Sequence, residues 1–130
     1  DLSYRAHQRG WRVMYEPRSV VRHDHGATIS RDYAPEFVRC VSLRNRIIFV
    51  LRNVRDPGRL ISSCAWMFLR LIGGLLTGKT EFARALFGAM RSIPQIRQRR
   101  RADRCIAKSD AAIVAETSRW FSPEQGDGAV

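Results

Sequence analysis

Residues 60–77 limit the folds open to this chain more than any other segment. The run is strongly apolar and about as long as the roughly 20 residues that a helix needs to cross a bilayer. It also contains Arg70, and a charge at the centre of a bilayer costs about 2.5–3.5 kcal/mol. On a helical wheel, small and polar residues gather beside Arg70, while large apolar residues take the rest. The run therefore predicts a helix that spans a membrane, lies in its plane or packs on a protein core. Its amphipathic pattern favours the in-plane arrangement, with Trp66, Phe68 and Arg70 at the membrane.

The charge balance of the chain agrees with an anionic partner. Lys and Arg total 23 against 12 Asp and Glu, which gives a net charge of +11. Beyond Pro94 lies a basic run that includes Arg99, Arg100 and Arg101, and each such residue near an anionic leaflet adds about 1 kcal/mol of attraction. We therefore expect a membrane surface as the partner. A nucleic-acid-binding module is the alternative, but no such motif is present, so we expect no nucleic acid.

A helical pattern begins near Asp32. Apolar residues including Leu43, Ile47 and Val50 recur on one face, and the sequence Asp56-Pro57-Gly58 ends the pattern. Phe82, Leu86 and Met90 predict a further helix. The three cysteines form no Cys-x-x-Cys pair, so we interpret them as reduced thiols. Residues 109–130 form a predicted tail, whose end from residue 122 we expect to be disordered.

The first 31 residues predict a different kind of structure. Residues 1–8 have a helical pattern, and Gly10 suits the position after a helix end, where the backbone turns left-handed. Residues 11–15 alternate as in a strand, and residues 19–23 are a second short β segment. We therefore predict an α/β fragment over residues 1–31, a basic and mainly α-helical extension over residues 32–108, and the tail.

Several residues of this opening stand in an order that resembles a known family. They are Asp1-Leu2, Arg5, Gly10, Pro17 and His23. This order is similar to the end of the catalytic core in family 2 glycosyltransferases of the GT-A fold, including rhamnosyltransferases. The resemblance implies transfer of a sugar from a nucleotide-sugar donor, with Mg²⁺ or Mn²⁺, to a lipid-linked or cell-surface glycan acceptor. It further implies a peripheral location on the cytoplasmic face of a membrane.

The same resemblance suggests that the chain is one part of a larger enzyme. In the family, an acidic pair that holds the catalytic base stands before the residue corresponding to Asp1, and a metal-binding Asp-x-Asp lies further upstream. Neither is present here. We therefore expect the chain to be inactive alone, with no catalytic residue of its own.

The resemblance also assigns roles to individual side chains. His23, or alternatively His25, is expected to contact the divalent metal, since a neutral imidazole is a common metal ligand. Asp1 is either a neighbour of the acceptor site or a helix cap. Arg44 and Asn45 are expected near the donor phosphate. For His23 the alternative is a hydrogen-bonded residue at a strand end, and for Arg44 and Asn45 it is a solvated helix face.

Overall fold

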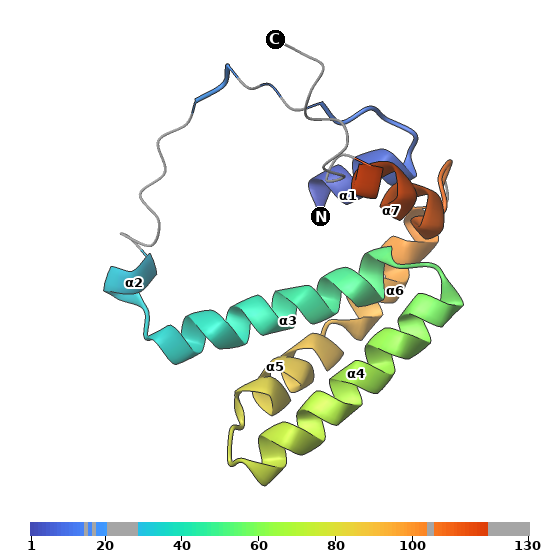
Figure 1. Ribbon diagram of the computed structural model, residues 1–130. Coiled ribbons are helices and arrows are strands. Elements are labelled where there is room, and N and C mark those ends of the chain that lie inside the picture. The colour runs from blue at the N-terminus through green and yellow to red at the C-terminus, as the bar shows by residue number, and fades with distance from the viewer. Residues whose placement is uncertain (15, 17, 21–28, 104–105, 120–130) are drawn as a thin grey trace.

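The computed structural model describes residues 1–14, 16, 18–20, 29–103 and 106–119. Within these residues the secondary structure consists of seven helices and contains no strand (Figure 1). The helices are α1 (Leu2–Gln8), α2 (Ile29–Asp32), α3 (Pro35–Asn53), α4 (Pro57–Leu76), α5 (Glu81–Met90), α6 (Ile93–Ala102) and α7 (Asp110–Arg119).

The predicted α/β character of the first 31 residues is wrong. Residues 11–14 and 19–20 form no strand, whereas Tyr15 and residues 21–23 of the predicted strands lie outside the described residues. A strand needs a neighbour to satisfy its backbone N–H and C=O groups, and the described part of the chain supplies none. Trp11 and Met14 are also exposed, so the alternating pattern does not mark a buried face. The protein is a mainly helical small structure.

The first helix follows its sequence signals closely. α1 starts after Asp1 and is followed by Gly10, whose φ of +77° confirms the predicted left-handed turn. Asp1 makes no side-chain cap, but its carboxylate lies 3.4 Å from Nε of Arg5 one turn later. This contact is an ion pair between residues one turn apart, a spacing that supports a helix.

The core lies where α5 packs between α3 and α4 (Figure 1). Ile47 of α3 contacts Phe82 and Ala89 of α5 in one buried cluster, and Met67 and Leu71 of α4 cover its edge. Ala85 and Ala89 are fully buried, and such small side chains let two helices approach closely. The helical faces predicted for α3 and α5 therefore meet each other.

The predicted break at Asp56-Pro57-Gly58 is confirmed, since α3 ends at Asn53 and α4 begins at Pro57, and both Pro57 and Pro94 lie in the first turns of helices. Pro57 opens α4, and the Asp56 carboxylate accepts a hydrogen bond of 2.8 Å from the backbone N–H of Arg59. Pro94 is the second residue of α6. A first turn tolerates proline because its N–H groups have no intrahelical partner there.

The helix α7 lies within the predicted tail, and hydrogen bonds connect it to α1 and to the turn between α3 and α4. The Asp110 carboxylate accepts hydrogen bonds from the Tyr4 hydroxyl and from the backbone N–H groups of Arg55 and Asp56. One side chain therefore joins α1, the turn between α3 and α4, and the start of α7. Residues 122–130, for which we predicted disorder, lie outside the described residues.

Candidate functional site

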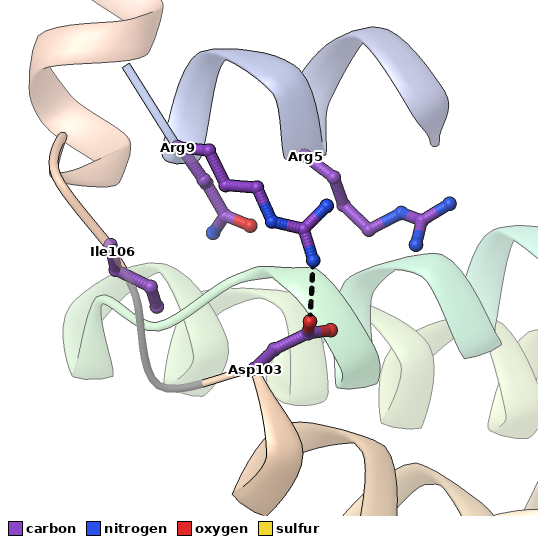
Figure 2. A pocket seen from close by; sticks show the side chains of 5 residues that line it. Arg5, Arg9, Asp103 and Ile106 are labelled. Atoms are coloured by element: carbon purple, nitrogen blue, oxygen red, sulfur yellow. Dashed lines mark hydrogen bonds and ion pairs between the residues drawn. The ribbon is translucent and has the colours of Figure 1, made fainter. Parts of the chain in front are cut away.

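Asp1 lies in a cluster of arginines and carboxylates at the contact of α1, α3 and α6. Its side chain accepts a hydrogen bond of 2.8 Å from Asn53 and lies 3.8 Å from Nη1 of Arg52. A second carboxylate, Asp103, binds Arg9 at 2.7 Å and lies 3.9 Å from Arg52, and Figure 2 shows the contact with Arg9. The residue predicted beside the acceptor site is therefore part of an ion-pair network.

This cluster is too small to hold a substrate. The hollow lined by Arg5, Arg9, Asp103 and Ile106 (Figure 2) has a volume of about 10 Å³, roughly the space of one water. Burial and the nearby cations of Arg5 and Arg99 lower the pKa of Arg52, and Asp103 partly offsets this. The arrangement is that of a structural network joining three helices.

At the neighbouring contact of α3 and α6, two arginines each cap the C-terminal end of one of these helices. Arg100 donates hydrogen bonds to the carbonyl oxygens of Leu51 and Val54 at the end of α3. Arg55 donates in return to the carbonyls of Arg100 and Asp103 at the end of α6. The guanidinium of Arg100, predicted to contact the membrane, is thus half-buried against the end of α3, and burial lowers its pKa. Arg99 and Arg101 are exposed on the same helix.

Most of the large apolar side chains of α4 face away from the fold. No residue of this 20-residue helix is buried. Phe68 is 62% exposed, Leu75 60% and Leu76 83%, and Ile61, Leu69 and Ile72 are exposed on the same helix. By length and composition α4 is able to cross a membrane. We call these six residues the α4 apolar face: Ile61, Phe68, Leu69, Ile72, Leu75 and Leu76.

Met67 and Leu71 of α4 lie instead toward α3 and α5, and the exposed Arg70 stands beside them. The guanidinium of Arg70 lies 5.1 Å from the ring centre of Trp66 and 5.4 Å from that of Phe82 on α5. On either side of Arg70 is a hollow, one of about 220 Å³ and one of about 270 Å³, and both are also lined by Leu43 and Phe82. We call these two adjoining hollows the Arg70 groove.

The predicted phosphate-binding pair lies away from Asp1. Arg44 and Asn45 are exposed on α3, with Nη2 of Arg44 3.4 Å from Oδ1 of Asn45. Asn53, which binds Asp1, lies eight positions after Asn45 on α3. This spacing corresponds to about 12 Å along the helix axis. The stem of Arg44 lies against Gly88 of α5. The structure therefore does not bring this pair together with Asp1.

The predicted metal ligands His23 and His25 lie outside the described residues. Among the residues that are described, no three or more His, Cys, Asp or Glu side chains gather in a group of the kind that holds a metal ion. His7, on α1, lies 4.0 Å from Glu116 of α7.

Comparison with protein-family models, with curated proteins and with solved structures finds no match to this chain.

Proposed function

We propose that this chain is a peripheral membrane-binding module, with α4 lying in the plane of an anionic bilayer surface. The α4 apolar face carries this proposal. A helix on the surface of a soluble domain turns its large apolar side chains inward and its polar ones outward. α4 departs from this pattern, since Phe68 and Leu75 are exposed although Met67 and Leu71 of the same helix already pack against the core. A face of this kind marks a site of contact with a membrane or a protein.

The two sides of α4 have different surroundings, and this difference supports the in-plane arrangement. One side packs through Met67 and Leu71 against the α3–α5 core, so only the other side is open to lipid. Arg59 in the first turn of α4 and Lys79 just beyond its end are exposed, which places positive charge at both ends. The net charge of +11 attracts the module to anionic headgroups.

We test this proposal with vesicles and with fluorescence from Trp66. The expected result is flotation with vesicles that contain phosphatidylglycerol, and much weaker flotation with phosphatidylcholine alone. In a W11F/W120F variant, Trp66 is the only tryptophan, and lipids brominated near the headgroup are expected to quench it more than lipids brominated near the chain ends. Salt-sensitive binding to DNA without vesicle binding would contradict the proposal, as would strongest quenching at the bilayer centre.

The wider activity that we propose is sugar transfer by a family 2 glycosyltransferase, for which this module holds the enzyme at the cytoplasmic leaflet. The support is the order of Asp1-Leu2, Arg5, Gly10, Pro17 and His23, together with an acceptor class that resides at membranes. The donor is a nucleotide-sugar used with Mg²⁺ or Mn²⁺, and the acceptor is a lipid-linked or surface glycan. The 130 residues contain neither the acidic pair nor the Asp-x-Asp of that family.

The catalytic proposal is tested by release of nucleoside diphosphate from nucleotide-sugars. We expect no release by the 130-residue chain. We expect Mn²⁺-dependent release when the chain is expressed with its upstream coding region, and loss of most of that release in a His23→Ala variant. A matched His7→Ala variant serves as the control and should retain activity. Absence of an acidic pair from the upstream region, with no release, would disprove sugar transfer and leave the membrane proposal standing.

A further inference from the structure

The Arg70 groove contains an unusual pairing of positive charge with an apolar wall. The 220 Å³ hollow is lined on the apolar side by Leu43, Ile47, Val50, Met67 and Phe82, from all three helices α3, α4 and α5. Arg46 and Arg70 line the same hollow from opposite helices. Ile47, Phe82, Leu43 and Met67 belong to the core cluster, so the wall is part of the folded core.

The positive charges of Arg46 and Arg70 have no paired carboxylate in the part of the chain that the structure describes. In the described part of the chain, neither guanidinium, of Arg46 or of Arg70, is in an ion pair or a hydrogen bond with another side chain. The contacts of Arg70 are aromatic rings, which orient the guanidinium but supply no carboxylate or carbonyl oxygen to its N–H groups. Lys79 lines the adjoining hollow and adds a third cation.

The one carboxylate that lines the groove is already engaged. Glu81 lies in the 270 Å³ hollow, but its Oε1 is 3.1 Å from Nη2 of Arg39. The hydrogen bonds from Arg39 lower the pKa of Glu81, so that this pair holds its charges at neutral pH. Arg46, Arg70 and Lys79 therefore remain as net positive charge beside an apolar wall.

We propose that the Arg70 groove binds a single anionic lipid, with its phosphate at Arg46 and Arg70 and the start of one hydrocarbon chain along Leu43, Ile47 and Val50. The inference rests on the proposed membrane function, since the bilayer is the source of the lipid. Guanidinium groups suit phosphate because their N–H donors match two oxygens at once. The apolar wall gives a chain-bearing phosphate an advantage that inorganic phosphate lacks.

The groove is tested with a soluble lipid, dihexanoyl phosphatidate below its micelle concentration, titrated calorimetrically into the whole chain. We expect one lipid bound per chain, with much weaker binding of inorganic phosphate and of dihexanoyl phosphatidylcholine. An R46Q/R70Q variant should weaken phosphatidate binding by about tenfold or more, as expected from loss of charged hydrogen bonds. A control variant, R84Q/R97Q, removes the same charge from exposed positions outside the groove and should bind within about twofold of the parent chain.

A second variant tests the apolar wall without changing charge. Val50→Trp places a large ring into the 220 Å³ hollow and should weaken phosphatidate binding as strongly as R46Q/R70Q, with helicity by circular dichroism unchanged. Equal losses in R46Q/R70Q and R84Q/R97Q would overturn the proposal, because they indicate diffuse attraction. Inorganic phosphate binding as tightly as phosphatidate would also overturn it. Failure of the parent chain to bind vesicles would instead disprove the membrane function, which the same preparation tests.

Discussion

Replacing Asp110 with alanine is expected to lower the free energy of unfolding by about 3 kcal/mol, because two partly buried backbone N–H groups and the Tyr4 hydroxyl lose their acceptor. Asp110 is only 3% exposed, and it receives hydrogen bonds of 2.5 Å from Tyr4 and 2.7 Å from the N–H of Asp56. Without it, α7 loses these hydrogen bonds to the turn between α3 and α4. Urea denaturation followed by far-ultraviolet circular dichroism measures the effect.

Asp103→Ala is the matched control for this carboxylate. Asp103 also binds arginines, but its side chain is 32% exposed, and partly exposed ion pairs contribute about 0–1 kcal/mol. We expect Asp103→Ala to have less than half the effect of Asp110→Ala. Equal effects of the two substitutions would show that net charge, and not the hydrogen bonds of Asp110, stabilises the fold.

The same carboxylate gives the stability a pH dependence. Burial alone would raise the pKa of Asp110, but the hydrogen bonds from Tyr4, Asp56 and Arg55 outweigh it and hold that pKa below its ordinary value. A lowered pKa means that the stabilisation is fully present above the unfolded pKa of about 3.9 and is lost as pH falls through the folded value. Asp110→Asn should therefore remove part of the acid dependence below about pH 4.

The helices of the core were predictable from the sequence because their signals are local. The apolar period of α3, the capping sequence at Asp56 and the left-handed Gly10 depend on residues within one or two turns. The strands were predicted wrongly because a strand depends on a partner elsewhere, which an alternating pattern at residues 11–15 does not supply. α7 carried a signal that we did not use: Ser109 precedes an apolar run, and its Oγ accepts from the N–H of Ala112.

The contacts of the candidate site were less predictable than the helices. The amphipathic pattern of α4 indicated which side chains share a face, and the structure leaves Phe68 exposed as expected. It gave no sign that Arg70 would lie over Phe82, because that contact joins two helices. Likewise, the sequence alone does not distinguish Arg100 from its neighbours Arg99 and Arg101 in the basic run. Only the packing of α6 against the end of α3 sends its side chain inward.

Truncation of the α4 apolar face is expected to weaken binding to anionic vesicles by about a hundredfold in a Phe68→Ala/Leu75→Ala variant. Burying a Phe or Leu side chain in an apolar medium is worth about 1.5–3 kcal/mol, and losing most of two such contributions costs about 3 kcal/mol of binding free energy. Both side chains are more than half exposed, and alanine favours helix, so the free energy of unfolding should change little. Vesicle co-sedimentation over a range of lipid concentrations gives the two partition coefficients.

The matched control for this truncation is Leu2→Ala/Val114→Ala, which removes exposed apolar side chains from α1 and α7 and should leave vesicle binding within about twofold of the parent chain. If both double variants bind as the parent chain does, positive charge alone holds the protein at the membrane, and the exposed face of α4 belongs to a contact with protein. If only the α4 variant loses binding and the loss persists at high salt, the hydrophobic contribution is established. Salt screens the attraction of the basic residues but not the transfer of Phe68 and Leu75 into lipid, so the two contributions separate in one experiment.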